Sequence, residues 1–301
     1  MSRTPEIRFR DRETGAIRTE LLFGEKELRF LYENAFGRML TDLVLRREKL
    51  NHLYGWIQRS RESARRIPHF IRRLGIDAAE AERPVESYRT LDDFFTRRLK
   101  PGARPIDRAP SHLVSPADGR VLACPRVTGE LRVKDSRVTI AELVGDPALA
   151  RRYEGGDALV VRLAPADYHR FHFPEAGSAS RAKTIGRGLH SVHPVALAAG
   201  APAFKNKRSV TRLETGRFGP LLLIEVGALI VGTIVQTYTP GPVARGQEKG
   251  CFRFGGSTVV LLAEPGRLAL DDDLVESSAR GLETLVKVGT RIACARRPAL
   301  V

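Results

Sequence analysis

Short apolar runs bounded by glycine and proline dominate the chain beyond its first third. They are GRVLACPRV (119–127), DALVVRLAP (157–165), GPLLLIEVGALIVGTIVQTY (219–238), STVVLLAE (257–264) and ETLVKVGTRIA (283–293). Runs of this length between turn-forming residues are typical of buried β-strands. We therefore expect a sheet-dominated region with few helices.

A helical period governs residues 24–75. Leu28, Leu31, Ala35 and Met39 recur at intervals of three and four residues, which places them on one face of a helix. Two further apolar sets follow: Leu40, Leu43 and Val44, then Leu50, Leu53, Tyr54 and Ile57. These segments predict amphipathic helices.

Prolines mark the change from the helical pattern to the strand-like pattern. The stretch LDDFFTRRLKPGARPIDRAP predicts a short helix followed by a connector, and Pro84 lies just before it. We place a boundary there, between an N-terminal helical region (residues 1–83) and a β-rich domain (residues 84–301). The expected fold class is α+β.

The helical region has two interpretations. Residues 24–75 contain twelve Lys or Arg against six Asp or Glu, together with Trp56 and several leucines. Basic amphipathic helices of this kind can lie in the headgroup plane of an anionic membrane. A helical layer packed on the rest of the protein would show the same pattern, and periodicity alone favours neither.

Composition narrows the classes of function. The net charge of +15 indicates an anionic partner, whether nucleic acid, membrane surface or acidic substrate, although 41 arginines against nine lysines also fit a coding bias. Three widely spaced cysteines form no CxxC pair and predict a reducing compartment. The N-terminus lacks the apolar core of a signal peptide, and the most apolar stretch, residues 221–235, is shorter than the roughly 20 residues of a membrane span.

Four of the seven histidines form HxxH pairs, His169 with His172 and His190 with His193. Two imidazoles three residues apart can share a metal ion where the backbone is helical. No carboxylate or cysteine stands at a diagnostic spacing, so a structural role is favoured for any one of these histidines alone.

Two further stretches carry candidate chemistry. Asp118 lies in SPADGRV, where it either forms an Asp-Gly turn or orients a histidine as the acid of a Ser-His-Asp arrangement does. Ser257 follows two glycines in CFRFGGSTVVLL, which lacks a GxSxG elbow. Because Gly256 has no Cβ, the Ser257 hydroxyl can approach the Gly256 carbonyl closely, and such a joint can attack itself.

These stretches, in this order, resemble the phosphatidylserine decarboxylase proenzyme family. The similarity rests on DDFFTRRLKPGARPI, SPADGRV, DYHRFHFP, HSVHPVA with FKNKRSV, VGALIVGTI, EKGCFRFGGSTVVLL and ETLVKVGTRIA. FRDRETG and LYGWIQRSRESARRIPHFIRRLGID extend it over nearly the whole chain. Two positions differ from the usual family pattern. Gly255 stands where many relatives have Leu, although GGST also occurs in the family. HSVHP stands where relatives more often have YSVNP, so we assign His190 and His193 no role.

The resemblance implies self-cleavage between Gly256 and Ser257. Ser257 would attack the Gly256 carbonyl, and the resulting ester would eliminate and hydrolyse to leave an N-terminal pyruvoyl group, the covalent cofactor. The products would be a β chain (residues 1–256) and an α chain (residues 257–301). The 45 residues of the α chain are too few for a domain of their own, so we expect them to remain a strand of the parent fold.

The resemblance also assigns roles to residues. Asp118, His172 and Ser257 would form the triad that drives cleavage, and His169 would serve decarboxylation and proton delivery. The pyruvoyl ketone would form a Schiff base with the amine of phosphatidylserine and accept the electrons released with carbon dioxide, giving phosphatidylethanolamine. No metal is then needed.

The implied partners are phosphatidylserine in an anionic membrane and the two cleaved chains themselves. The expected location is peripheral, on the cytoplasmic face of a bacterial cell membrane. A role in phospholipid biosynthesis follows, and nucleic acid is not an expected partner. The oligomeric state is open, with a homo-oligomer among the alternatives. Arg170, Lys205 and Arg208 are candidates for holding substrate phosphate and carboxylate by charge alone, and each fits an ordinary surface role equally.

Three rival interpretations stay open at this point. A serine hydrolase would use the same Asp118, His172 and Ser257 without cleaving its chain. A metal-dependent hydrolase would be built on the HxxH pairs. A basic non-catalytic module would bind membrane or RNA, although no aromatic stacking motif supports RNA binding.

Overall fold

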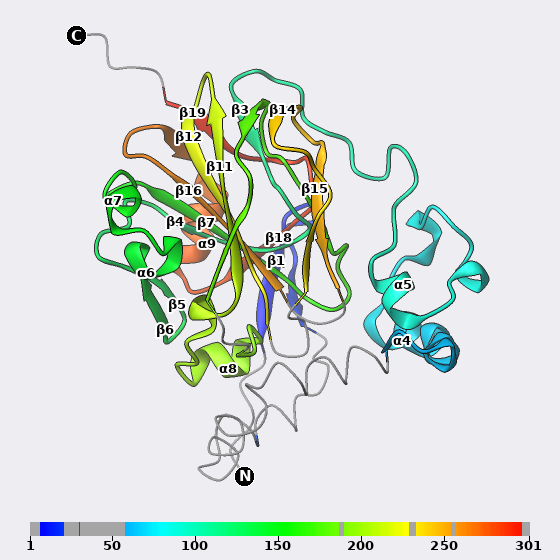
Figure 1. Ribbon diagram of the computed structural model, residues 1–301. Coiled ribbons are helices and arrows are strands. Elements are labelled where there is room, and N and C mark those ends of the chain that lie inside the picture. The colour runs from blue at the N-terminus through cyan, green and yellow to red at the C-terminus, as the bar shows by residue number, and fades with distance from the viewer. Residues whose placement is uncertain are drawn as a thin grey trace.

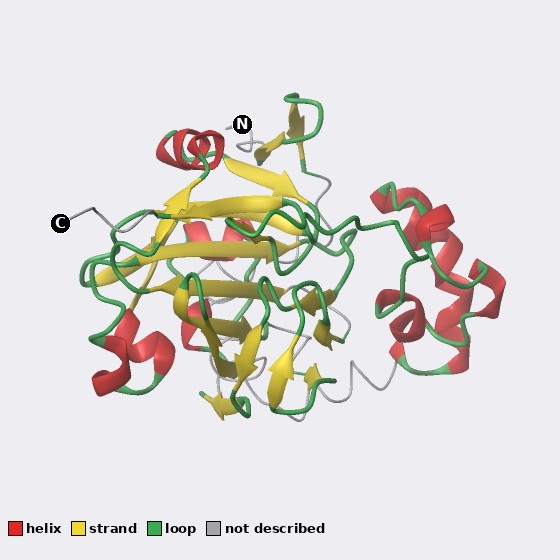
Figure 2. Ribbon diagram, turned by 90° about the horizontal axis from the view of Figure 1, so that it is seen from above, coloured by secondary structure: helices red, strands yellow, loops and turns green. Residues whose placement is uncertain are grey.

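The computed structural model describes residues 7–20, 30, 58–186, 190–228, 233–253 and 257–296. Within these ranges the largest sheet has eleven strands in the order β14-β9-β11-β12-β16-β7-β4-β18-β1-β2, and β10 pairs with β11 beside that path. Figures 1 and 2 show this sheet at the centre of the molecule. Its strands are β1 (Arg8–Asp11), β2 (Ile17–Thr19), β4 (Gly119–Cys124), β7 (Asp157–Leu163), β9 (Gly177–Ala179), β10 (Lys183–Ile185), β11 (Arg208–Thr215), β12 (Gly219–Val226), β14 (Gly241–Val243), β16 (Ser257–Ala263) and β18 (Glu283–Val286).

The central strands of this sheet are buried on both faces. Alternate residues of β7 enter two separate apolar clusters, with Leu159 and Val161 in one and Ala158 and Val160 in the other. The strands β12 and β16 alternate in the same way. A strand covered on both faces reads as a continuous apolar run. The expected strands at 157–165 and 257–264 are confirmed, and in the described part of the run 219–238 there are two strands, β12 and β13 (Ile234–Gln236).

Two three-stranded sheets cover one face. They are β13-β15-β8 and β17-β19-β3, and they contribute Phe171, Phe252 and Ile292 to the same cluster as Leu159. Helix α9 (Asp272–Ala279) adds Leu274 to that cluster. The strands are β3 (His112–Val114), β8 (Arg170–His172), β13 (Ile234–Gln236), β15 (Glu248–Phe252), β17 (Leu268–Leu270) and β19 (Arg291–Ala295).

The opposite face is covered by short helices and a hairpin, which lie together on one side of the sheet in Figure 1. The hairpin and the helices after it bring Leu131, Val138 and Leu143 into the cluster that contains Val160. These elements are β5 (Glu130–Val133), β6 (Ser136–Thr139), α6 (Ile140–Val144), α7 (Pro147–Ala150), α8 (Pro194–Ala198) and the 3-10 turn η5 (Ala203–Lys205).

Two strands come from the region expected to be helical. β1 runs parallel to β18, with Phe9 opposite Glu283, and β2 returns antiparallel to β1. The prediction of a helical region over residues 1–83 did not include them. Strands of three and four residues with several charged side chains carry too little apolar periodicity to be found from sequence.

A separate lobe of short helices lies beside the sheets, near β15 (Figure 1). Its elements are η2 (Arg61–Arg66), α4 (Ile67–Leu74), η3 (Ala78–Glu80), η4 (Val85–Ser87) and α5 (Leu91–Phe95). One apolar cluster, from Ile67 to Phe95, joins them and crosses the boundary placed at residue 84. The short helix expected in LDDFFTRRL is confirmed as α5, whose first turn is capped by the Thr90 side chain accepting from the Asp93 N–H.

Helix α4 is amphipathic, and its apolar face is already used within the lobe. Ile67, Phe70 and Leu74 are buried in the lobe, whereas Arg72 and Arg73 on the other side are exposed. For this helix the packed-layer interpretation is therefore confirmed. The helices predicted over residues 24–57 lie outside the described residues, apart from residue 30. Across the ranges that the structure describes, no helix has both the length and the apolar composition needed to cross a bilayer.

Candidate active site

Ser257 is the first residue of β16 and is fully buried. It lies opposite Leu163, the last residue of β7, in an antiparallel pair. Its Oγ has no hydrogen-bond partner among the described residues. Gly256 falls outside them. A buried hydroxyl without a partner is costly in a folded protein and is a sign of chemical function.

Asp118 lies at the same end of the sheet, immediately before β4. The residue after it, Gly119, approaches the neighbouring strand so closely that a Cβ there would lie 2.6 Å from the Arg162 carbonyl oxygen. This Gly-only contact fixes where the turn enters the sheet. Arg120 pairs with Arg162 across β4 and β7. The turn that contains Asp118 therefore lies next to the loop that follows Leu163 at the end of β7.

An arginine holds the Asp118 carboxylate. Arg104 Nε lies 3.0 and 2.9 Å from the two carboxylate oxygens, Arg104 Nη2 donates to one of them at 2.7 Å, and the Val288 N–H donates at 2.8 Å. Burial raises the pKa of Asp118, and the ion pair with Arg104 opposes that effect by favouring the charged form. Arg104 also binds both carboxylate oxygens of Glu80 at 2.9 Å, which ties the helical lobe to the sheet.

His169 follows the loop of residues 164–168 that leaves the end of β7. Its Nδ1 lies 2.9 Å from the Asp167 carbonyl oxygen. Because a carbonyl oxygen only accepts, Nδ1 carries the proton, and in the neutral ring Nε2 is the nitrogen without one. The ring is fully buried, and its centroid lies 3.9 Å from that of Phe95 in α5.

Buried charges hold the loop that precedes His169. The Asp167 carboxylate accepts from the Ala164 N–H at 2.6 Å and forms an ion pair with Arg120. Next to it, the buried Arg162 binds Glu20 and Glu283. Although burial alone would raise it, the charge of Arg162 lowers the pKa of Glu20 to about 2. The loop therefore rests on a network that spans β2, β4, β7 and β18.

His172 ends strand β8 on the smaller sheet. Its backbone N–H donates to the Pro116 carbonyl at 2.7 Å, which brings it beside the turn that carries Asp118. Tyr168 stacks on the imidazole with centroids 5.8 Å apart. Burial lowers the pKa of His172 to about 4; Glu248, its cross-strand neighbour, opposes the shift and Arg170 adds to it. The imidazole is therefore neutral at pH 7.

A buried ion pair fastens the His172 sheet to the central sheet. Lys249 Nζ on β15 lies 2.9 Å from the Glu225 carboxylate on β12. The Nζ also lies 5.1 to 6.0 Å from the ring centroids of Phe171, Phe173 and Tyr238. An ammonium over aromatic faces gains cation–π attraction, which offsets part of its desolvation.

The structure brings the backbones of Asp118, His172 and Ser257 to one end of the sheet without joining their side chains. Among the described residues, neither Ser257 Oγ nor His172 Nδ1 has a hydrogen-bond partner, and Asp118 is bound by Arg104. Catalytic hydrogen bonds are often absent in resting structures and form only in the reacting complex. The triad stays a prediction from the family resemblance.

The other histidines and candidate cations have structural contacts. His193 caps α8, its Nδ1 accepting from the Val195 N–H at 3.2 Å. Arg170 pairs with Glu248 at 2.8 Å, Lys205 is exposed and pairs with Glu142 at 2.7 Å, and Arg208 donates to the Leu143 carbonyl at 2.7 Å. In the described part of the chain, no three His, Cys, Asp or Glu side chains are grouped as metal ligands would be.

A cavity of about 370 Å³ opens beside the candidate residues. Asp118 and Tyr168 line it, but His169, His172 and Ser257 do not. Four arginines line its wall, and none was predicted as a functional residue from sequence: Arg18, Arg97, Arg104 and Arg120. The last three fall in stretches that carry the family resemblance, DDFFTRRLKPGARPI and SPADGRV, but nothing local to those stretches indicates what each arginine contacts.

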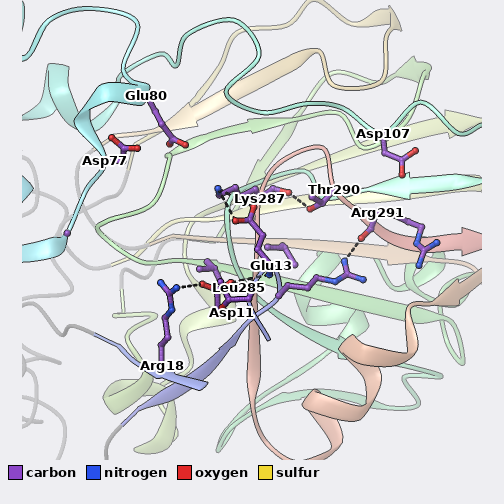
Figure 3. Close-up of a pocket in the computed structure, with 14 residues that line it drawn as sticks. Asp11, Glu13, Arg18, Asp77, Glu80, Asp107, Leu285, Lys287, Thr290 and Arg291 are labelled. Atoms are coloured by element: carbon purple, nitrogen blue, oxygen red, sulfur yellow. Dashed lines mark hydrogen bonds and ion pairs between the residues drawn. The ribbon is translucent and has the colours of Figure 1, made fainter. Parts of the chain in front are cut away.

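A second cavity, of about 670 Å³, continues from the first. The two share lining residues, among them Glu80 and Lys287. Figure 3 shows its wall, in which Lys287 pairs with Glu13 and Arg18 with Asp11. Lys287 and Arg18 in the wall of this second cavity therefore already have carboxylate partners.

The chain is similar in sequence to known proteins of one enzyme family. A family model described as Phosphatidylserine decarboxylase matches residues 91–294. Curated proteins called phosphatidylserine decarboxylase proenzyme are similar over nearly the whole chain. The protein from Fusobacterium nucleatum subsp. nucleatum is 41% identical over 290 residues, which cover 95% of this chain and 97% of the relative. The one from Chlamydia caviae is 42% identical over 288 residues, covering 94% and 96%.

The sheet, the buried Ser257 and these similarities define a decarboxylase made as a proenzyme. The chain belongs to the phosphatidylserine decarboxylase family. The family resemblance inferred from the sequence is confirmed.

The low pKa of His172 predicts acid sensitivity. An unfolded histidine titrates near 6.5 and the folded one near 4, so the unfolded state binds the additional proton first as pH falls. The stability that His172 contributes is complete above pH 6.5 and is lost as pH falls toward 4, a change on the order of 3 kcal/mol. Denaturant unfolding of the Ser257→Ala protein between pH 6.5 and 4 should show the free energy of unfolding falling as the pH falls. Adding His172→Phe should make this fall smaller.

The exposed His69 provides the control, because His69→Phe should leave the fall in the free energy of unfolding unchanged. The same fall with and without the His172 imidazole would contradict the assignment.

Proposed function

We propose that the protein converts phosphatidylserine to phosphatidylethanolamine with a pyruvoyl group that it makes from its own Ser257. The observation that carries the proposal is the buried Ser257 hydroxyl, which has no hydrogen-bond partner in the described part of the chain and follows Gly256 in sequence, in a chain similar over its length to decarboxylase proenzymes. The name proenzyme implies a cleavage, and this joint has the chemistry for it.

The surroundings of Ser257 fit a pyruvoyl group. The residue lies at the end of a central strand, buried, with Leu163 opposite and Thr258 next to it also buried. A small ketone needs a site closed to bulk water and a fixed orientation; the burial of Ser257 supplies the first and its place in a paired strand the second. Strands β12 and β16 would hold the group through the backbone of Thr258, which pairs with Val226.

Cleavage follows from the chemistry of the Gly256–Ser257 joint. Ser257 Oγ adds to the Gly256 carbonyl carbon, the peptide C–N bond breaks, and an ester and an amine form. Loss of the Ser257 Cα proton then expels the Gly256 carboxylate and leaves dehydroalanine. Water hydrolyses this enamine, releasing ammonia and leaving the ketone. The carbon skeleton of the cofactor comes from Ser257, its ketone oxygen comes from water, and the Ser257 Oγ stays in the new Gly256 carboxylate.

His172 is the base that the first step needs. Its imidazole is neutral at pH 7 because burial lowers its pKa to about 4, so it can take the hydroxyl proton. For Asp118 to orient this imidazole, its carboxylate has to exchange contacts with Arg104 for contact with the ring. The hydrogen bond from the His172 backbone N–H to the Pro116 carbonyl keeps His172 beside the turn that contains Asp118.

His169 is suited to the later proton transfer. The pyruvoyl carbonyl supplies an electron sink for the bond that breaks when carbon dioxide leaves. The Asp167 carbonyl fixes the imidazole tautomer, so Nε2 is the nitrogen that takes up and delivers a proton. Phe95 excludes water from the ring by packing on its face.

Cleavage would not release the α chain. Its first strand, β16, pairs with β12 on one side and β7 on the other, in the middle of the sheet. The same segment supplies β18, which pairs with both β4 and β1. Both chains would therefore remain one folded unit, in agreement with the expectation from the length of residues 257–301.

The site would act at the surface of an anionic membrane, on the cytoplasmic face of a bacterial cell. A diacyl lipid must present its headgroup to the protein, and residues 24–57 carry the apolar and basic pattern of interfacial helices. The exposed Arg72 and Arg73 of α4 would add charge attraction, although its apolar face is already buried in the lobe.

Intact mass spectrometry tests the cofactor. The wild-type protein should show an α chain that begins at residue 257 and is lighter than the serine-terminated peptide by one ammonia molecule. Ser257→Ala should remain one chain of 301 residues. A folded wild-type protein that stays intact and reacts with serine-directed phosphonates would instead support a serine hydrolase.

The two histidines should separate maturation from turnover. His172→Ala should block cleavage, because no other base is assigned to Ser257. His169→Ala should be cleaved but lose decarboxylase activity by at least about 100-fold, the lower range for a general acid–base group. Gel electrophoresis and release of carbon dioxide measure the two steps. Normal cleavage of both variants would refute this division, and the matched control is His69→Ala on the exposed face of α4.

Vesicle sedimentation tests the membrane surface. The protein should bind vesicles containing phosphatidylglycerol more tightly than phosphatidylcholine vesicles, and Leu50→Glu with Leu53→Glu should weaken binding several-fold. Arg132→Glu, on an exposed side chain of β5, changes net charge by the same amount and should have a smaller effect. Equal losses in both variants would mean that net charge, not an apolar face, determines binding.

A further inference from the structure

Arg97 stands out among the cations that line the 370 Å³ cavity. Its side chain is buried, with 5% of the residue exposed, yet it forms no ion pair with any described carboxylate. Its Nε and Nη1 have no hydrogen-bond partner among the described residues, and Nη2 makes one long contact of 3.3 Å to the Ala166 carbonyl. The guanidinium carbon lies 5.0 Å from the Phe94 ring centroid.

The other three arginines of this wall have carboxylate partners. Arg104 binds Asp118 and Glu80, Arg120 pairs with Asp167, and the exposed Arg18 pairs with Asp11. Their charges are largely neutralised, so they shape the cavity without offering a full positive charge. Arg97 has no carboxylate at ion-pair distance among the described residues, although Asp118 and Asp167 attract its charge from further away. Burying a guanidinium with most of its N–H groups unpaired is costly unless a ligand completes its bonds.

The position of Arg97 connects it with the reacting residues. The one hydrogen bond of its side chain among the described residues goes to the loop of residues 164–168. This loop follows Leu163, which pairs with Ser257, and it is followed by His169. Phe94 and Phe95, on the helix just before Arg97, pack on Arg97 and on the His169 ring. A ligand group held by Arg97 would thus lie next to the site without touching the cleavage joint.

From these contacts we infer that Arg97 binds the phosphodiester of the phospholipid substrate, an inference that rests on the proposed function. Only one of the five N–H donors of this guanidinium is used among the described residues, so a fork of two parallel N–H groups remains for the oxygens of a phosphate in a bidentate arrangement. The cavity volume is in the range of small-ligand sites, roughly 300 to 1,000 Å³, and suits a headgroup whose acyl chains remain outside.

The chemistry of decarboxylation distinguishes the two anionic groups of the headgroup. A cation beside the carboxylate would stabilise the charge that has to leave as neutral carbon dioxide, and so would oppose the reaction. The phosphodiester keeps its charge throughout and lies three bonds from the reacting Cα. It is therefore the group that an arginine can hold without slowing the chemical step.

Kinetics can identify which anion Arg97 holds, because the product retains the phosphodiester and has lost the carboxylate. For Arg97→Gln, assayed in detergent micelles at varied mole fractions of phosphatidylserine, KM should rise about tenfold or more, as expected for a lost hydrogen bond to a charged group. The inhibition constant of phosphatidylethanolamine should rise by the same factor, and kcat should stay within about twofold. Arg97→Lys, which keeps the charge, should lie between the two proteins.

Arg98→Gln is the matched control, since this neighbouring arginine is exposed, and it should leave all three constants unchanged. A rise in KM with unchanged inhibition by phosphatidylethanolamine would assign Arg97 to the carboxylate and overturn the inference. Unchanged KM in Arg97→Gln would overturn it as well, and so would a lowered melting temperature with normal kinetics, which would make Arg97 a structural residue.

The variant should be compared only as cleaved protein, with its pyruvoyl content measured by mass spectrometry. Wild-type protein without a pyruvoyl group or without carbon dioxide release would refute the proposed function itself. Wild-type protein that is cleaved and active, beside an Arg97→Gln protein with unaltered KM and inhibition, would refute only the role of Arg97.

Discussion

The pairing of β16 with β7 is the contact on which the site depends. It places Ser257 opposite Leu163, at the point where β7 gives way to the loop that leads to His169. The next strand, β4, pairs with β7 in a register that brings Asp118 to the same end. A shift of one residue in β16 would turn Ser257 to the other face of the sheet, because strand side chains alternate. The continuous apolar character of these strands gives that register its energy, through two cores at once.

Charge, rather than further apolar packing, fixes the end of the sheet where the site lies. Arg162 is buried between Glu20 and Glu283, Arg120 holds the Asp167 loop, and Arg104 holds Asp118. Removing one member of such a pair leaves a buried charge uncompensated, at a cost of several kcal/mol. These ion pairs position the residues at this end of the sheet. Arg97 differs from the three arginines that form them, because its buried guanidinium has no carboxylate at ion-pair distance among the described residues.

The sequence predicts the two kinds of element in this fold unequally. Buried strands such as β7 and β16 are evident as apolar runs, and α5 follows from its flanking residues. The strands β1 and β2 are too short and too charged to be recognised, and β18, to which β1 pairs, lies far away in the chain. The candidate residues Asp118, His169, His172 and Ser257 come from a family resemblance that the comparisons support. The contacts that hold the site could not be predicted, because they join residues that are separated in sequence. Arg104 and Asp118 are 14 residues apart, and Arg162 and Glu20 are 142 residues apart.

The central position of β16 has a consequence for refolding. Before cleavage, one continuous chain folds, and the strand reaches its place by an intramolecular search. If the chain is cleaved before Ser257, as proposed, residues 257–301 become a separate molecule, and recovering the sheet from the unfolded state becomes a second-order process that depends on protein concentration. The proposed order of events is then fixed: the chain would fold first, make its reactive group second, and could not readily repeat the first step. The working lifetime of the cleaved protein would be determined by its rate of unfolding rather than by an equilibrium between folded and unfolded forms.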